Sequence, residues 1–308
     1  WNRLQSRCAG SSVFMRWEWH YTWWQVYAGK NDHLHIIVWR EDGEVVGLLP
    51  LYRQACGIIP GRACLRLTGT GEAAIDEVAT EYGDVLADVE QQTRISSMAA
   101  DHLLRFDDWT HIEMTCLLED SLLHRLLVSD SKSHTRVRSA GLRYRLPLHG
   151  GEAEYLESLG PSRAKRIRRS QRAAAKDGGI VLTSVDSVAG FEDAFRELAE
   201  LNDERQSQKR RKSVFSSVRF QQFHRQLSDQ LFADGAVDIV RFHLGDRLLA
   251  ALYCYYDADT CYYYQSGFTR KDSNRYMSLT LAHLMEMQRN RDAGRKYYDF
   301  MRGEPPTY

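Results

Sequence analysis

Two stretches of the chain have a largely apolar arm on either side of a short polar turn, and each predicts a β-hairpin. Residues 35–52 read H-I-I-V-W-R-E-D-G-E-V-V-G-L-L-P-L-Y, with Asp42-Gly43 at the turn. Residues 238–253 read D-I-V-R-F-H-L-G-D-R-L-L-A-A-L-Y, with Gly245 at the turn. The two hairpins align when Gly43 is placed on Gly245, and an aromatic-rich helical stretch precedes each. Unless this likeness is chance, the sequence predicts two copies of one α/β unit.

Further patterns around the first hairpin predict the rest of an N-terminal unit. Residues 11–27 carry aromatic side chains at helical spacing and indicate one or two helices. Their aromatic face belongs to the core or, alternatively, forms a wall that stacks on a sugar or contacts an acyl group. The remaining predicted elements are a strand at 65–70, a helix at 92–105, a buried strand at 110–117, a helix at 121–128 and a strand at 142–148 that closes the unit.

Residues 162–176, S-R-A-K-R-I-R-R-S-Q-R-A-A-A-K, predict a strongly basic helix. The stretch follows Pro161 and contains seven Lys or Arg residues and no acid. Because like charges at this density repel one another in an isolated helix, we expect an anion or an acidic surface nearby. Three interpretations are open: a solvated linking helix, a clamp for the phosphates of a cofactor, or a platform for a polyanion such as tRNA.

The stretch from Asp259 to Gly303 has the pattern of a strand, a polar loop, a helix and a returning strand. Residues 262–269 are aromatic and predict the first strand, and residues 297–301 predict the second. The loop R-K-D-S-N-R-Y-M leads into a helix that Ser278 would cap and Gly294 would end. The N–H groups of the loop and the helix dipole would then form a cradle for an anion such as a phosphate.

The motifs of this stretch resemble the acyl-CoA core of the GNAT acyltransferases. Q-S-G-F, N-R-Y-M-S-L and Y-D-F-M-R-G-E-P-P-T-Y are similar to the cellulose-biosynthesis and exopolysaccharide-associated acetyltransferase-like branch, which is related to the Fem-type aminoacyl transferases. The resemblance implies an α/β (α+β) fold of two tandem GNAT-like domains, each a mixed, mostly antiparallel sheet flanked by helices. Residues 1–150 would form the N-terminal domain, 151–178 a basic linking helix, and 179–308 the C-terminal domain with the acyl-CoA site.

The same resemblance implies that acetyl-CoA, or another acyl-CoA, is the co-substrate, and that the loop before the last helix holds its pyrophosphate. The positions that match the family's cofactor site are Gln265, Gly267, Asn274, Arg275, Tyr276, Met277 and Ser278. The family usually has Pro-Gly near Met277-Ser278, and this sequence lacks it.

On the acceptor side, the family often carries an acidic-Tyr-x-Asp element, which Glu81, Tyr82 and Asp84 match. Glu81 or Asp84 would take the proton of the acceptor, and Tyr308 or Tyr82 would return one to the leaving thiolate. Alternatively, these acids are structural groups held by hydrogen bonds.

The resemblance also implies a set of substrate-binding residues, which are Tyr82, Arg205, Asp299 and Glu304. Arg205 matches an Arg in the family's substrate stretch. The family's His and Trp in that stretch are replaced here by Asn202 and Gln206, so that His is not available as a general base.

Composition narrows the classes of function. A chain of 308 residues with a formal net charge of +0 makes no electrostatic case for binding DNA or a membrane surface. No apolar run approaches the roughly 18 residues of a membrane span, and the N-terminus, which begins at Trp1, lacks a signal-peptide pattern. Six scattered cysteines without C-x-x-C spacing favour reduced thiols in a cytoplasmic protein.

Several enzyme classes are disfavoured by missing motifs. The sequence has no G-x-S-x-G elbow and no P-loop, and no H-x-x-x-H pair with an acid on one helix, so we expect no metal in catalysis. Three functions remain: an acyl-CoA-dependent N- or O-acyltransferase acting on an amino sugar, polysaccharide precursor or small amine; a Fem-like aminoacyl-tRNA-dependent transferase; or a non-catalytic subunit of an envelope polysaccharide system. The sequence does not define the acceptor or the oligomeric state.

Overall fold

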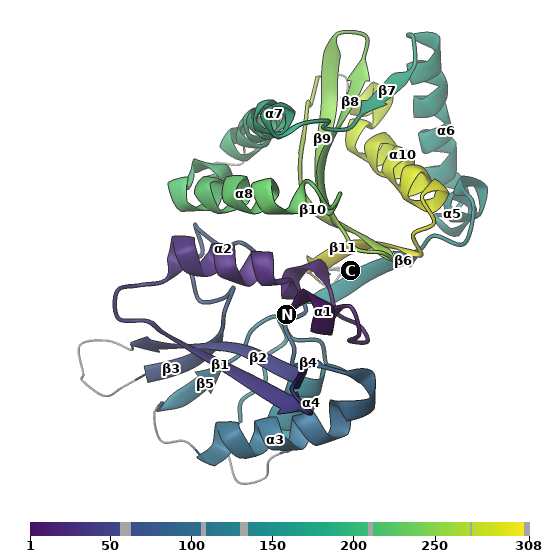
Figure 1. The fold of residues 1–308 in the computed structure, drawn as a ribbon. Coiled ribbons are helices and arrows are strands. Elements are labelled where there is room, and N and C mark those ends of the chain that lie inside the picture. The colour runs from purple at the N-terminus through teal and green to yellow at the C-terminus, as the bar shows by residue number, and fades with distance from the viewer. Residues whose placement is uncertain (56–62, 106–108, 130–134, 209–211, 272, 305–308) are drawn as a thin grey trace. The chain divides into compact units, whose positions relative to one another are not determined.

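The computed structural model describes residues 1–55, 63–105, 109–129, 135–208, 212–271 and 273–304. The chain folds into two compact units, Trp1–Ala140 and Gly141–Tyr308, and each unit combines one mixed sheet with helices (Figure 1). This is the mixed α+β architecture that the pattern of the sequence predicts. Within the described residues, none of the helices has the length and apolar character that crossing a membrane requires.

The first unit is built on the sheet order β1-β2-β3-β5, with β4 paired to β2. Its elements are α1 (Asn2–Gln5), η1 (Val13–Met15), α2 (Trp17–Tyr27), β1 (His33–Glu41), β2 (Glu44–Ala55), β3 (Ala63–Leu67), β4 (Leu86–Ala87), η2 (Val89–Gln91), α3 (Gln92–Arg105), β5 (His111–Glu113) and α4 (Leu122–Ser129). β1, β2 and β3 are antiparallel, whereas β3 and β5 are parallel. Asp42 and Gly43 form the predicted hairpin turn with φ values of 49° and 85°.

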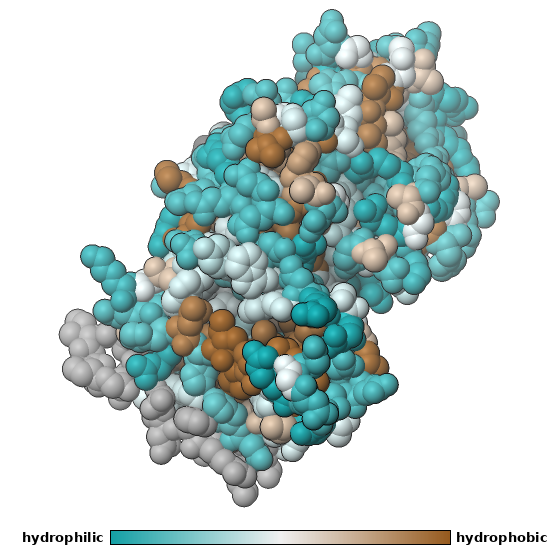
Figure 2. All heavy atoms as spheres, in the orientation of Figure 1, coloured by the Kyte–Doolittle hydropathy of each residue, from teal (hydrophilic) through white to brown (hydrophobic). Residues whose placement is uncertain are grey.

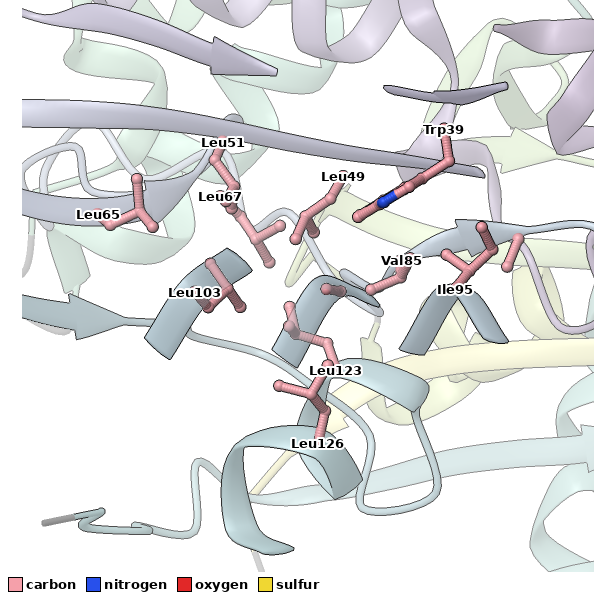
Figure 3. Packing of buried hydrophobic residues seen from close by; sticks show 12 residues of the cluster. Trp39, Leu49, Leu51, Leu65, Leu67, Val85, Ile95, Leu103, Leu123 and Leu126 are labelled. Atoms are coloured by element: carbon pink, nitrogen blue, oxygen red, sulfur yellow. The ribbon is translucent and has the colours of Figure 1, made fainter. Parts of the chain in front are cut away.

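Side chains of β2 alternate between the two faces of this sheet. Leu49 and Leu51 belong to a core with residues of α3 and α4, among them Ile95 and Leu103 (Figure 3). On the other face, Tyr52 packs against Trp23 of α2, with ring centroids 5.1 Å apart. The aromatic face of α2 is therefore largely core, because Trp19 and Trp23 are almost fully buried.

The buried strand predicted over residues 110–117 is wrong in length and in burial. β5 spans only His111–Glu113, and both of these end residues are exposed. β5 lies at the edge of the sheet and pairs with β3 on one side. An edge strand has one neighbour, so little of its surface is covered.

The second unit has the sheet order β6-β11-β10-β9-β8-β7. Its elements are β6 (Leu142–Pro147), α5 (Glu152–Ser158), α6 (Pro161–Lys176), β7 (Ile180–Thr183), α7 (Val188–Gln208), η3 (Val214–Ser216), α8 (Val218–Leu231), β8 (Val237–Leu244), β9 (Arg247–Tyr256), β10 (Thr260–Phe268), α9 (Ser273–Tyr276), α10 (Ser278–Asp292) and β11 (Tyr297–Gly303). β10 and β11 are parallel, and the other neighbours are antiparallel. Figure 1 shows α6 and α10 on one side of this sheet and α7 and α8 on the other.

The strand at 142–148 exists, but its predicted place in the first unit is wrong. β6 pairs with β11, with Leu146 opposite Tyr298, and so forms the edge of the second sheet. An alternating pattern predicts a strand without indicating which sheet it joins, because the partner is decided by residues far along the chain.

Candidate functional site

The sheet of the second unit opens between its two parallel strands. Residues Thr260–Tyr262 of β10 pair with Tyr297–Asp299 of β11, and the pairing ends there. Beyond it, β10 follows β9 and contains a β-bulge between Tyr263 and Gln265. β10 is therefore separated from β11 at its carboxyl end, the usual position of ligands in sheets with parallel strands. The chain leaves this end of β10 to form α9 and then α10.

The start of α10 combines a strained backbone with an unsatisfied hydroxyl group. Met277 is the N-cap residue and has left-handed angles, φ 46° and ψ 49°, which glycine adopts more readily. Ser278, predicted as the cap, is instead the first residue of the helix, because the chain turns at Met277. Its Oγ is buried and has no hydrogen-bond partner. The first N–H groups of a helix also lack partners within it, so this point concentrates hydrogen-bond donors.

The strain at Met277 leads to a prediction. Met277→Gly should have a free energy of unfolding about 0.5 to 1 kcal/mol higher than that of Met277→Ala, because relief of a left-handed residue outweighs the added chain entropy. Met277→Ala is the matched control, since it shortens the side chain but retains the strained φ. Urea unfolding of both variants checks the prediction, which fails if alanine stabilises the protein as much as glycine does.

Two of the predicted cofactor residues anchor α9 to the end of α6. Arg275 Nη2 lies 2.5 Å from Asp177 Oδ2, and the Tyr276 hydroxyl donates to the same oxygen at 2.8 Å. Asn274 also lies in α9, beside these anchors. Asp177 therefore holds the segment that precedes Met277 and α10.

Gly267 has a packing role at the opposite side of β10. A Cβ at Gly267 would lie 2.5 Å from the Leu201 Cβ and 2.8 Å from the Leu198 carbonyl oxygen, so only glycine allows α7 to approach β10 this closely. Next to this contact, Asn202 Nδ2 donates to the Ser266 carbonyl oxygen at 2.9 Å. Asn202, which replaces the family's His, thus joins α7 to β10. Gln265, at the bulge, is half-buried.

A histidine that the sequence analysis did not single out lies beneath β10 and β11. His283 of α10 places Nδ1 2.9 Å from the Tyr298 hydroxyl, and its ring packs edge-on against Tyr263. Burial lowers the pKa of His283 to about 4, so the imidazole is neutral at neutral pH. A histidine on the sheet-facing side of a predicted helix, between two aromatic strands, was the signal that could have revealed this group.

The basic residues of α6 all face solvent. The buried side of the helix consists of Ala164, Ile167, Ser170 and Ala174. Its seven basic residues are exposed and form no ion pair within the described part of the chain: Arg163, Lys165, Arg166, Arg168, Arg169, Arg172 and Lys176. The bond between Asp177 and Arg275 places the end of this helix beside α9. α6 therefore adds a dense positive charge near the start of α10.

The acidic element of the first unit contains one helix cap. Asp84 accepts backbone N–H groups of Leu122 at 2.9 Å and Leu123 at 2.7 Å, and it thereby caps α4. A third N–H, that of Val85, donates to the same carboxylate at 2.8 Å. Burial raises the pKa of Asp84, and the three N–H groups oppose that shift. Three backbone bonds give Asp84 a structural role.

Glu81 and Tyr82 lie beside this cap in a distorted segment. Both residues are buried, and Tyr82 has a φ of 60°. The Tyr82 N–H donates to the Cys116 carbonyl oxygen at 3.0 Å. Residues with left-handed backbone that are not glycine are often found at functional sites. The acceptor-side role that the resemblance implies for this segment stays a prediction.

The remaining predicted site residues lie in different surroundings. Asp299 is buried in an ion pair with Arg143, which donates from Nη2 at 2.5 Å. Glu304 is exposed, and its carbonyl oxygen accepts the Tyr144 hydroxyl at 3.0 Å. Arg205 lies over the Phe268 ring, 5.2 Å from the centroid. Tyr308 lies outside the described residues.

A second unassigned histidine is buried in the first unit. His20 Nδ1 lies 2.7 Å from Thr68 Oγ1 and 3.1 Å from the Thr68 carbonyl oxygen. The Thr68 hydroxyl donates to the Pro50 carbonyl oxygen, so Nδ1 carries the proton and Nε2 is the acceptor. Nε2 is buried without a partner, and burial lowers the pKa of His20 to about 4. His20 is therefore a neutral acceptor in the unit that contains Glu81.

One part of the chain matches a known protein family. Residues 161–307 match the family model of the acetyltransferase (GNAT) domain. This GNAT match contains the open strand pair, the start of α10 and the basic helix. A comparison with curated proteins found no matching sequence.

Solved structures extend the similarity to the whole chain. The crystal structure of FemX is 12% identical with a TM-score of 0.66, over 100% of this chain and 87% of FemX. A conserved protein of unknown function from Bacteroides thetaiotaomicron is 11% identical with a TM-score of 0.52, over 98% and 86%. The C-terminal domain of a putative lysylphosphatidylglycerol synthetase from Agrobacterium fabrum is 12% identical with a TM-score of 0.50, over 88% and 71%.

These similarities confirm the predicted fold of two tandem GNAT-like domains. The GNAT match supports an acyltransferase as the class of function. The narrower resemblance to the cellulose-associated branch stays a prediction.

Proposed function

We propose that the second unit binds acetyl-CoA or another acyl-CoA, and that the protein transfers the acyl group to an amine or hydroxyl. The acceptor would be an amino sugar, a polysaccharide precursor or a small amine. The observation that carries this proposal is the unpartnered Ser278 Oγ at the start of α10, within the segment that matches the GNAT domain. Buried polar groups normally have a partner, and a phosphate oxygen would supply one.

The residues at the start of α10 fit the pyrophosphate of coenzyme A. Ser278 Oγ and the first N–H groups of α10 are donors, and the helix dipole favours a negative charge there. The exposed cations of α6 would attract the same phosphates. When bound, acyl-CoA supplies the acyl group as an activated thioester. The chain's own residues then orient the acceptor and remove its proton.

We assign the role of general base to Glu81. Glu81 belongs to the acidic-Tyr-x-Asp element that the family resemblance implies on the acceptor side. Asp84, the other predicted acid, accepts three backbone N–H groups and caps α4, which favours a structural role for it. Tyr82 or Tyr308 would return a proton to the thiolate. Asp299, bound to Arg143, would orient β11 without exchanging a proton.

The test is the affinity of the full chain for acetyl-CoA, measured by calorimetry. Ser278→Ala should weaken binding by roughly tenfold or more, since it removes a hydrogen bond to a charged group. The same change should leave the free energy of unfolding unaltered or slightly higher, because it removes an unsatisfied buried hydroxyl. Ser96→Ala is the matched control, since Ser96 Oγ in α3 is also buried without a partner. Equal affinity in the two variants would contradict the phosphate site.

The exposed basic face of α6 favours a second candidate, a transferase that uses aminoacyl-tRNA. Seven exposed cations exceed the charge of one coenzyme A and suit a polyanion. Binding of aminoacyl-tRNA should then fall steeply with salt and be lost when Arg166 and Arg169 are both changed to Glu. Acetyl-CoA turnover without tRNA binding would support the first function, and the reverse would support the second. Absence of turnover with both donors would favour a non-catalytic subunit.

A further inference from the structure

Two histidines of the first unit, one on a strand and one on a helix, have imidazole nitrogens in contact. His35 Nε2 of β1 lies 2.9 Å from His102 Nε2 of α3. The ring centroids are 5.2 Å apart and the rings are inclined by 36°. Both side chains are half-buried, so solvent reaches the pair.

The alternation of β1 explains why His35 meets α3. Leu34, Ile36 and Val38 point away from this helix and are between 41% and 48% exposed, and Figure 2 shows hydrophobic surface over β1. The intervening residues, including Trp39, face α3, where Trp39 packs beside Ile95 (Figure 3). Trp39 therefore holds one end of β1 against α3, and His35 meets His102 at the other end.

The charge state of the pair suits metal binding. Two nitrogens in direct contact share one proton, so one ring donates and the other accepts. Neutral imidazole is the form that binds transition metals.

The spacing also suits a single ion. Two nitrogens that each lie about 2.0–2.1 Å from one ion are roughly 2.9–3.4 Å apart at bond angles of about 90–110°. The observed 2.9 Å is within that range, so the backbone of β1 and α3 need not move. The shared proton has to leave the donor Nε2, either to Nδ1 of the same ring or to solvent, and each ring has to tip until its lone pair points to the side of the line that joins the nitrogens.

We propose that His35 and His102 chelate a divalent transition-metal ion such as Zn²⁺, with water completing the coordination shell. The ion would join β1, which lies at one edge of its sheet, to α3. This role is structural and does not depend on the proposed acyl transfer.

Calorimetric titration of the full chain with ZnCl₂ tests this site. We expect saturable binding of one ion, with affinity at least tenfold lower in His35→Gln and in His102→Gln. His124→Gln is the matched control, because His124 is a half-buried histidine of the same unit outside the pair, and it should bind Zn²⁺ as the parent does. The proposal is overturned if the parent binds no ion, or if both pair variants retain its affinity.

A second candidate metal site in the same unit provides a further test of the proposal. Cys64, His111 and Glu113 place a thiol, an imidazole and a carboxylate within 4.8 Å of one another. Loss of zinc binding in His111→Gln, with binding retained in His35→Gln, would assign the ion to that cluster and overturn the proposal.

The fluorescence of Trp109 reports on ion binding without any change to His35 or His102. Its ring centroid lies 5.3 Å from that of His35. Cu²⁺ bound to the pair should quench Trp109 fluorescence, and Trp109→Phe should remove that part of the quenching while the affinity for Cu²⁺ is kept. Unchanged fractional quenching in Trp109→Phe would place the ion elsewhere.

Discussion

Replacing Arg143 with alanine is expected to lower the free energy of unfolding of the second unit by about 3 to 5 kcal/mol. The Asp299 carboxylate is fully buried, and Arg143 donates to it from Nε at 2.8 Å and from Nη2 at 2.5 Å. Without the guanidinium, the buried negative charge loses the group that compensates it. Urea unfolding of the full chain measures the change.

Arg145→Ala is the control for this prediction. Arg145 lies on the same strand, is exposed, and is 4.2 Å from the centroid of the Tyr297 ring, a contact that contributes about 0.5 to 1 kcal/mol. Equal losses in the two variants would show that the buried pair is no more important than a surface contact. Adding Asp299→Asn to Arg143→Ala should recover part of the loss, because the uncompensated charge is removed.

The ion pair between Arg143 and Asp299 also shows that the second unit begins before the segment that matches the GNAT domain. The GNAT match begins at residue 161, whereas β6 supplies Arg143 and the edge of the sheet from before that point. Asp299, predicted as a substrate contact, therefore depends on a strand outside the matched segment. We expect a substitution of Asp299 to change the stability of the second unit more than it changes substrate binding.

The second large effect should separate the two acids of the first unit. Glu81→Gln is expected to lower turnover by roughly a hundredfold or more, the usual scale for losing general-base help, with acetyl-CoA affinity and melting temperature retained. Asp84→Asn is expected to lower the free energy of unfolding by about 1 to 2 kcal/mol, because an amide oxygen caps α4 less well than a carboxylate that accepts three N–H groups. Steady-state kinetics and thermal unfolding of both variants provide the measurements.

Each variant is the control for the other, since both neutralise an acid of the same segment. If Glu81→Gln melts earlier but turns over normally, Glu81 is structural and the base lies elsewhere. In that event the buried acceptor nitrogen of His20 would be the next group to substitute, because it is neutral and in the same unit. A full loss of turnover in Asp84→Asn, at unchanged stability, would reverse the assignment.

The sequence by itself determined the helices, strands and turns that are encoded by residues close together in the chain. Helix α3 spans residues 92–105 as predicted, and both hairpins turn where Gly43 and Gly245 occur. The order of strand, loop, helix and strand at the C-terminus was also readable, because aromatic strands and helix ends have short-range signals. The motifs of that stretch carried the resemblance that the GNAT match and the FemX-like fold support.

The tertiary structure alone decided which distant residues meet. β6 reads as a strand, yet its pairing with β11 depends on residues about 150 positions away. Asp84 caps α4 only because the fold brings that helix to it, and Arg275 and Tyr276 bind Asp177, which lies about 100 positions away in the chain. The contact of His35 with His102 likewise requires β1 to pack on α3. Such roles arise from three-dimensional proximity, and no local pattern of apolar and polar residues encodes them.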